Sequence, residues 1–260
     1  MVGQIEIHNI VRSFEGVNGS EDVMALDHLS LDIPAEAFVS IIGPSGCGKS
    51  TLLRLIAGLD QPNEGEILLD GERIERPGPE RGFAFQQANL FPWLTIRENL
   101  SFGLKARHVF KKEKKSVDDY LKLVGLEGFE KSYPHQLSGG MCQRASLARA
   151  LVGHPKVLLM DEPLGALDAF TRMNMQDEIL RIWKEHHMTM IMVTHDVDEA
   201  IYLSDYVIVM SARPAKVEKV IPIKLSRPRA RKQDTFLKYR TEILELLDYG
   251  GEVQEMDYYL

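Results

Sequence analysis

Residues 38–59 read "FVSIIGPSGCGKSTLLRLIAGL", a short apolar run, a glycine-rich turn and a second apolar run. "FVSII" is typical of a buried strand, and "STLLRLIAGL" predicts a helix that stops near Gly58. The turn between them fits the pattern G-x-x-x-x-G-K-[ST], and the strand before it and the helix after it are the context that this pattern requires. The stretch therefore predicts an α/β fold with a phosphate-binding turn rather than a chance glycine-rich loop.

Each residue type in this turn has a physical reason to be there. Glycines allow backbone N–H groups to curl around phosphates at the start of a helix. Lys49 can reach the terminal phosphates of a nucleotide, and the Ser50 hydroxyl can ligate Mg²⁺. The predicted nucleotide-binding residues of the turn are Gly43, Pro44, Ser45, Gly46, Cys47, Gly48, Lys49, Ser50 and Thr51.

Other segments place this turn in a larger sheet. "KVLLM" (156–160), "MTMIMV" (188–193) and "DYVIVM" (205–210) are short apolar runs separated by helical segments. This alternation predicts a parallel sheet with helices on both faces. Near the N-terminus, "QIEIHNI" and "MALDHLSLDI" alternate as strands do, and "GEILLDGERI" predicts a hairpin that turns at Asp70-Gly71.

Acidic and imidazole side chains follow two of the apolar runs. Asp161 and Glu162 come directly after "KVLLM", and His195 comes after "MTMIMVT". Ligands of open α/β sheets bind where the strands end. There Asp161 can hold Mg²⁺ through its hard oxygens, and Glu162 can orient or deprotonate a water molecule. A solvated strand end and a structural histidine are the plainer interpretations, and the neighbouring phosphate turn favours the functional ones.

A second helix start has the features of an anion site. "LSGGMCQRASLARAL" (137–151) begins a helix with two glycines, although each costs roughly 1 kcal/mol there relative to alanine. Ser138 suits the N-cap position, and Gly139 and Gly140 allow a large anion to approach the unpaired N–H groups. These residues alone leave open whether both helix starts hold one nucleotide within one chain or two chains share it.

The motifs together resemble those of ATP-binding cassette (ABC) ATPases. "GPSGCGKST", "FAFQQ", "LSGGM", "VLLMDE", "GALD" and "VTHD" occur in the order of that family, between residues ~5 and ~225. The resemblance implies a P-loop NTPase (RecA-like) core of parallel strands with an N-terminal antiparallel β subdomain. It also implies one ATPase domain over residues 1–225 with a helical subdomain at about 88–152, followed by a tail, residues 226–260, with an amphipathic helix.

The resemblance also implies roles for single residues. Two copies would pair head to tail, so that Ser138, Gly139 and Gly140 of one close over the ATP bound by the other. Gln86 would lie near Mg²⁺ and the attacking water, Glu162 would be the general base, and His195 would contact the γ-phosphate. Asp168 would end the loop that crosses the dimer. Phe14 is the candidate for stacking on adenine, and a core phenylalanine is the alternative.

Composition and cysteine content limit the other possibilities. The chain of 260 residues carries a net charge of −7, which gives no electrostatic reason to bind nucleic acid. No apolar run approaches the ~18 residues of a membrane span, and the first residues lack the pattern of a secretory signal. Cys47 and Cys142 are too few for a disulfide framework. Cys47 is a candidate reactive thiol beside a helix start, and Cys142 departs from the polar residue common after "LSGG".

The family serves transporters and non-transport machines of DNA repair or translation. Ser138 follows Lys49 by 89 positions, which leaves no room for a long coiled coil, and there is one set of motifs, so transport is the interpretation we follow. Residues 77–104 resemble cassettes of nitrate, sulfonate and taurine importers. That resemblance implies a separate membrane permease gripped near Phe91 and Trp93, a solute-binding protein, and a place on the cytoplasmic face of the membrane. A core position for the two aromatic residues is the alternative.

Two basic runs have plain interpretations. Lys105 to Lys115 predicts a solvated helix face, and Arg227 to Lys232 predicts a flexible exit from the domain. Contact of the second run with anionic lipid is the alternative. After it, Phe236, Ile243 and Leu247 define one side of the predicted amphipathic helix.

Overall fold

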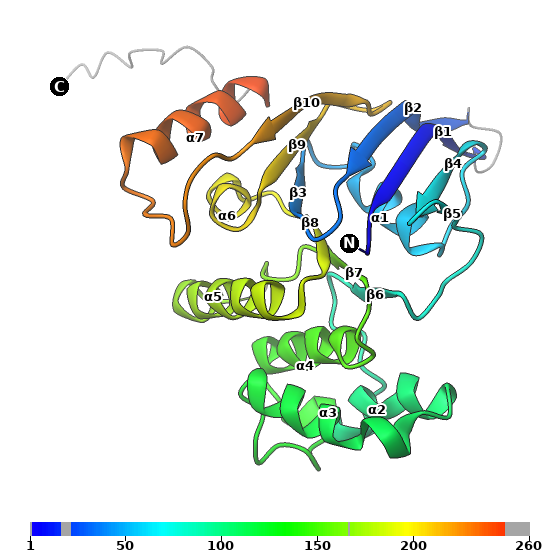
Figure 1. The fold of residues 1–260 in the computed structure, drawn as a ribbon, viewed down its shortest axis with the longest axis vertical. Helices are drawn as coiled ribbons and strands as arrows, with labels where there is room; N and C mark the ends of the chain where they lie inside the picture. The colour runs from blue at the N-terminus through cyan, green and yellow to red at the C-terminus, as the bar shows by residue number, and fades with distance from the viewer. Residues whose placement is uncertain (1, 17–21, 166, 248–260) are drawn as a thin grey trace.

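The computed structural model describes residues 2–16, 22–165 and 167–247, and it contains two sheets (Figure 1). The larger one has six strands in the order β10-β9-β3-β8-β7-β6. Neighbouring strands in it pair in parallel, except that β10 is antiparallel to β9 at one edge. Its strands are β3 (Phe38–Ile42), β6 (Arg81–Ala84), β7 (Val157–Asp161), β8 (Thr189–Val193), β9 (Tyr206–Met210) and β10 (Val217–Pro222).

Both faces of the parallel strands are buried, which explains why they are continuously apolar in sequence. In β3, Val39 and Ile41 belong to one core cluster, and Phe38 and Ile42 belong to the other. The expected strands β3, β7, β8 and β9 are therefore confirmed. The sequence analysis did not identify β6 and β10, because each is short or partly exposed and lacks a long apolar run.

The smaller sheet is antiparallel, with the order β2-β1-β4-β5. It contains β1 (Ile5–Phe14), β2 (Val23–Ile33), β4 (Glu64–Leu69) and β5 (Glu72–Arg73). Asp70 and Gly71 both have positive φ angles, 52° and 80°, as the predicted hairpin turn requires. The apolar side of α1 (Lys49–Ala57) shares a core cluster with this sheet and with one face of the larger sheet.

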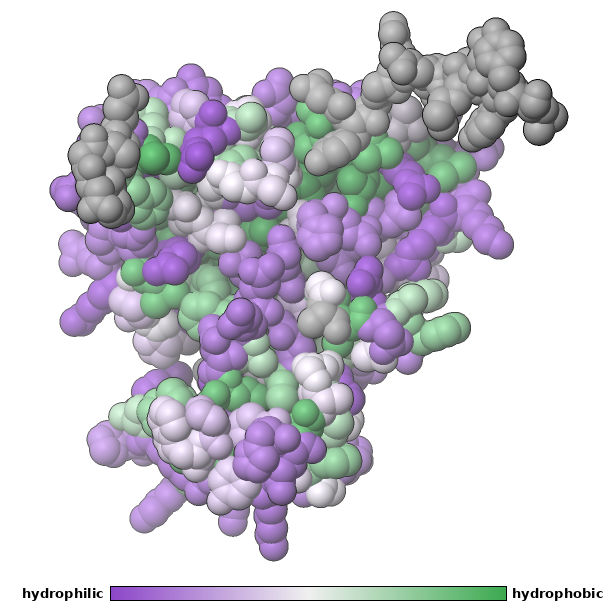
Figure 2. All heavy atoms as spheres, turned by 180° about the vertical axis from the view of Figure 1, so that it is seen from behind, coloured by the Kyte–Doolittle hydropathy of each residue, from purple (hydrophilic) through white to green (hydrophobic). Residues whose placement is uncertain are grey.

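Three helices form a lobe below the sheets: α2 (Ile96–Ala106), α3 (Phe110–Leu123) and α4 (Gly139–Leu151) (Figure 1). Figure 2 shows a notch at one side between this lobe and the rest of the molecule. Thr95 and Glu98 form the expected capping box at the start of α2. The basic run 105–115 is mainly exposed, as predicted, but it is split between two helices near His108, whose φ is 61°.

The C-terminal part contains α5 (Ala169–His186), α6 (Val197–Leu203) and α7 (Asp234–Leu246). Phe236 and Ile243 of α7 are buried in the core cluster that also contains α4, α5 and α6, which agrees with the expected amphipathic pattern.

The prediction of a flexible, solvated or lipid-facing run at 227–232 is wrong for its arginines. Arg229 is only 5% exposed, because carbonyl groups of the core accept its hydrogen bonds.

None of the helices in the described ranges is long and apolar enough to cross a membrane.

Candidate functional site

The phosphate turn lies between β3 and α1, as the sequence predicted. Gly46 and Gly48 have φ angles of 73° and 120°, which side chains with a Cβ rarely adopt. A Cβ at Gly48 would also lie 3.0 Å from the Ala25 carbonyl oxygen. The Lys49 ammonium donates to the carbonyl oxygens of Gly43 at 2.8 Å and Pro44 at 2.9 Å, so the turn wraps around it. The start of α1 thus combines a cation with backbone N–H groups, which suits a phosphate.

Asp161 and Ser50 meet beside this turn. The Ser50 hydroxyl donates to Asp161 Oδ1 at 3.0 Å, although the two residues are 111 positions apart. Burial raises the pKa of the Asp161 carboxyl above its ordinary value, and the hydrogen bond from Ser50 opposes that shift. A hydroxyl and a carboxylate are hard oxygen ligands of the kind that Mg²⁺ prefers.

The remaining ligands of such an ion would have to come from water or a bound phosphate. Within residues 2–16, 22–165 and 167–247, no group of three or more His, Cys, Asp or Glu side chains is arranged to hold a metal ion. Mg²⁺ usually keeps several waters and uses one or two protein carboxylates together with phosphate oxygens. The Ser50–Asp161 pair fits that mode of binding.

Glu162 is the centre of a second polar group. Gln86 Nε2 donates to Glu162 Oε2 at 2.9 Å, and His195 Nδ1 lies 3.5 Å from Glu162 Oε1. Glu162 has a φ of 46°, a left-handed conformation that costs a non-glycine residue roughly 1–3 kcal/mol. Its backbone N–H donates to the Val193 carbonyl oxygen at 2.9 Å, which holds the strand end in place. Loops after β6, β7 and β8 therefore deliver an amide, a carboxylate and an imidazole to one point.

These groups line one pocket of about 630 Å³. Its lining residues are Phe14, Ala25, Ser45, Gly46, Gly48, Lys49, Ser50, Thr51, Gln86, Glu162, His195 and Arg213. The sequence analysis missed Arg213, although it follows β9 and β9 ends at the same edge of the sheet as β3. A polar residue just after each parallel strand was the signal that could have identified it.

Phe14 is at the end of β1 and 40% exposed, so it is not a core phenylalanine. The Arg12 guanidinium lies 4.5 Å from the centre of its ring, and Asp60 pairs with Arg12 at 2.9 Å. An aromatic ring that lines the pocket and is held by a fixed cation provides a flat surface for a base.

Residues of the second helix start do not line this pocket. Ser138 is the N-cap of α4 and accepts a hydrogen bond from the Met141 N–H at 3.3 Å, as expected. The space around Gly139 is open, and a Cβ on Gly140 would lie 2.9 Å from Leu167. Asp168 is the N-cap of α5, where hydrogen bonds from Thr171 lower the pKa of its carboxyl. One chain thus presents two separate anion sites, the pocket and the exposed start of α4.

Cys47 differs from the expectation of a reactive thiol, which the sequence raised for that cysteine alone. Cys47 is buried in the core beneath the phosphate turn, so a reactive surface thiol there is wrong. Cys142 donates from Sγ to the Pro134 carbonyl oxygen at 3.4 Å, and burial raises the pKa of its thiol. Both thiols therefore serve packing.

An apolar groove of about 420 Å³ lies between β6 and the helical lobe. Phe91 lines it and packs against Phe102, with 4.6 Å between ring centres, and against Trp93 at 5.5 Å. Trp93 is 70% exposed, so its alternative position in the core is wrong. Lining residues of the groove lie on both sides of Gln86 in the chain, Phe85 before it and Asn89 after it, which connects the groove in sequence to the polar pocket.

Comparisons with known proteins agree with this geometry. The model of the ABC transporter family matches residues 26–165. A relative from Bacillus cereus, named as an aliphatic sulfonates import ATP-binding protein, is 48% identical over 250 residues, which cover 96% of this chain and 98% of the relative. An uncharacterized ABC transporter ATP-binding protein from Methanocaldococcus jannaschii is 49% identical over 245 residues, 94% of this chain and 91% of that protein.

Solved structures are similar as well. A bacterial ABC transporter cassette determined as a dimer has a TM-score of 0.77 at 33% identity and covers 85% of this chain and 100% of its own. A dimeric cassette in a post-hydrolysis state, bound to ADP and phosphate, has a TM-score of 0.76 at 32% identity, with the same coverage of both chains.

Proposed function

The chain belongs to the ABC transporter family and is an ATPase, and from this premise we propose that it powers import of a small organic anion, an aliphatic sulfonate, through a separate membrane permease. The meeting of Gln86, Glu162 and His195 beside the phosphate turn supports the power source, and the names of the sulfonate-import relatives support the substrate. A DNA-repair or translation machine has no support in these relatives, which are named as import or transporter proteins.

In the proposed complex, ATP occupies the pocket with its base against Phe14 and its phosphates in the turn. The turn residues Gly43 to Thr51 supply N–H groups, and Lys49 supplies the positive charge. Ser50, Asp161 and Gln86 would hold Mg²⁺, which when bound neutralises charge on the phosphates. The hydrogen-bonded oxygen pair of Ser50 and Asp161 supports this assignment.

Glu162 is then the general base. Its carboxylate accepts a proton from the attacking water, whose oxygen forms the new bond to the γ-phosphorus as the bond to ADP breaks. Gln86 fixes Oε2 through a hydrogen bond of 2.9 Å, so the other oxygen points toward His195. His195 is placed to donate a hydrogen bond to the γ-phosphate, which gains charge as it leaves ADP.

A second copy completes the site. The start of α4 carries unpaired N–H groups and partial positive charge, yet it does not line its own chain's pocket. In a head-to-tail pair, Ser138, Gly139 and Gly140 of each copy close over the ATP held by the other, and Asp168 lies at the seam. The dimeric cassettes among the similar structures support this arrangement.

The permease would grip the aromatic groove. Phe91, Phe102 and the exposed Trp93 form an apolar surface of the kind that anchors a partner. Because lining residues of the groove flank Gln86 in the chain, closure of the dimer and movement of the permease are coupled through this segment. The protein would then work at the cytoplasmic face of the cell membrane, with a solute-binding protein that delivers the substrate from outside.

Growth on alkanesulfonate as sole sulfur source tests the proposed substrate. Cells that lack the gene should fail to grow on the sulfonate and should grow normally on sulfate. The wild-type gene should restore growth, and the Glu162→Gln variant should not. Unchanged sulfonate uptake in the deletion strain would refute sulfonate as the substrate and would leave the ATPase activity itself intact.

A further inference from the structure

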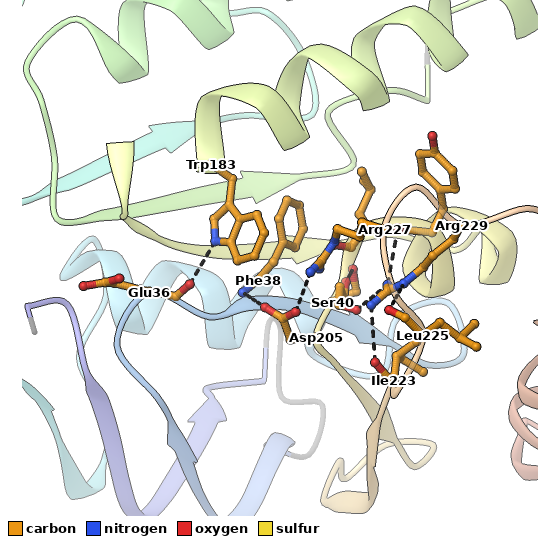
Figure 3. Close-up of polar contacts among 12 residues, drawn as sticks. Glu36, Phe38, Ser40, Trp183, Asp205, Ile223, Leu225, Arg227 and Arg229 are labelled. Atoms are coloured by element: carbon orange, nitrogen blue, oxygen red, sulfur yellow. Dashed lines mark hydrogen bonds and ion pairs between the residues drawn. The ribbon is translucent and has the colours of Figure 1, made fainter. Parts of the chain in front are cut away.

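Residues 224–233, which join β10 to α7, form a segment that we call the C-terminal strap. Arg227 fixes its first half: Nη1 donates to Asp205 Oδ1 at 2.7 Å, and Nη2 donates to the Leu203 carbonyl oxygen at 2.6 Å. The guanidinium also lies 4.4 Å from the centre of the Trp183 ring. Figure 3 shows Arg227 between Asp205 and Trp183, and Asp205 in turn accepts a hydrogen bond from the Phe38 N–H of β3.

Arg229 fixes the middle of the strap. Its side chain donates to carbonyl oxygens of Ile201, Ser204 and Leu225 (Figure 3). Two of these carbonyls are at the C-terminal end of α6, where a cation is favourable. Burial lowers the pKa of Arg229 to about 10, which leaves it charged at neutral pH. The strap is therefore held in one position against α6.

This position brings Arg231 to a buried chain of hydrogen bonds. Arg231 Nη2 donates to Gln176 Oε1 at 2.5 Å, and its guanidinium lies 4.1 Å from the centre of the Tyr202 ring. Gln176 Nε2 donates to Glu199 Oε1 at 3.1 Å. Both Gln176 and Glu199 are 3% exposed.

These hydrogen bonds lead to the two residues that flank His195 in the sequence. The Thr194 hydroxyl donates to Glu199 Oε2 at 2.6 Å and accepts from the Asp196 N–H at 3.1 Å. Thr194 and Asp196 are the two neighbours of His195 along the chain. A connection of side chains thus runs from the strap, through α5 and α6, to the loop that presents His195.

Arg231 and Glu199 together fix the orientation of the Gln176 amide. A guanidinium has donors and no acceptor, so Arg231 forces the oxygen of the Gln176 amide toward itself and the amide NH₂ toward Glu199. Glu199 then receives one donor on each carboxylate oxygen, and Thr194 is left to hold the Asp196 N–H. Without Arg231, the nearly buried oxygen of the Gln176 amide loses its donor, and the amide is held only through its hydrogen bond to Glu199, so Glu199 and the Thr194 anchor are held less tightly.

We propose that Arg231, Gln176 and Glu199 are positioning residues for His195, and that the C-terminal strap thereby sets the rate of ATP hydrolysis. Arg231 lies outside the nucleotide pocket, so it influences turnover and leaves ATP binding to Phe14 and Lys49. The proposal rests on the proposed role of His195, which His195→Ala tests separately.

The test compares variants of the full-length chain in steady-state ATP hydrolysis. Arg231→Met keeps an apolar side chain beside Tyr202 and removes the guanidinium with its donors, and it should lower kcat about 10-fold with KM for ATP within about 2-fold, as expected for a displaced catalytic group. Arg231→Lys restores a donor-only group and should recover most of kcat. Arg240→Met is the matched control: Arg240 pairs with Asp198 of α6 at 3.1 Å outside the chain of hydrogen bonds, and kcat should not change.

A double-mutant cycle with Thr194→Val tests whether Arg231 affects kcat through the hydrogen bonds of Gln176, Glu199 and Thr194. The double variant should be no slower than the slower single variant, because both break one connection. Each of three results would overturn the proposal. The first is a double variant whose fold-decrease in kcat equals the product of the two single decreases. The others are an unchanged kcat in Arg231→Met, or an equal loss of kcat in Arg231→Met and Arg240→Met. If Arg231→Met does not fold, Arg231→Ala takes its place with the same expectations. Full turnover of His195→Ala would instead refute the role of His195 itself.

Discussion

Glu162→Gln is the substitution that tests the proposed chemistry most directly. The glutamine has the shape of the glutamate, and its oxygen can still accept the hydrogen bond from Gln86 Nε2, which is 2.9 Å long in the wild type. What it loses is the ability to take a proton. Because general base catalysis contributes about 10²–10⁴-fold, kcat should fall by that factor, or about 3–5 kcal/mol in the activation free energy.

ATP binding should not weaken in this variant, because the substitution removes a negative charge from a pocket that receives an anion. Closed dimers should therefore accumulate with ATP. Phosphate release measures turnover, and size-exclusion chromatography with and without ATP measures dimerisation. Glu218→Gln, an exposed change on β10, is the control and should behave as the wild type. Turnover of Glu162→Gln within about 3-fold of the wild type would exclude the general base contribution expected here.

Three further substitutions test other parts of the molecule. Ser138→Arg should abolish turnover and leave binding of a fluorescent ATP analogue intact, since it blocks the partner's site; full activity would show that one chain suffices. Phe236→Ala should lower the free energy of unfolding by about 3–5 kcal/mol in urea titrations, whereas its exposed neighbour Leu237→Ala should not, and equal effects would contradict the buried position of α7. Thr95→Ala should lower the melting temperature at pH 7 by about 2–4 °C. The Thr95 backbone N–H and hydroxyl both donate to Glu98 and lower the pKa of its carboxyl, and Thr95→Ala removes only the hydroxyl. The contribution of the hydroxyl to Glu98 is present above the ordinary value of 4.5 and is lost as the pH falls through the folded value, so a difference between variant and wild type that does not shrink on acidification would be inconsistent with it.

Many residues of the site could be predicted from the sequence, because each belongs to a short segment with a recognisable pattern. Lys49, Ser50, Asp161, Glu162 and His195 each occupy the end of an apolar run or the turn after it. Parallel strands bring such ends to one edge, so the meeting of these residues followed from their positions. Arg213 obeys the same rule and was overlooked only because its strand end lacks a recognised motif.

The sequence by itself determined the strands other than β6 and β10, the phosphate turn, the capped helix starts and the acidic residues at the strand ends, because each depends on residues within about one or two turns of each other. Only the tertiary structure decided that the start of α4 lies outside its own pocket, that Trp93 is exposed, that Arg229 of the strap is buried and that Arg227 and Arg231 bind to groups of the protein. The last case shows the physical reason. A run of arginines is equally compatible with water, lipid or protein carbonyls, and the choice depended on free carbonyl groups at the end of α6 and an amide on α5, which are 24 to 55 residues away along the chain.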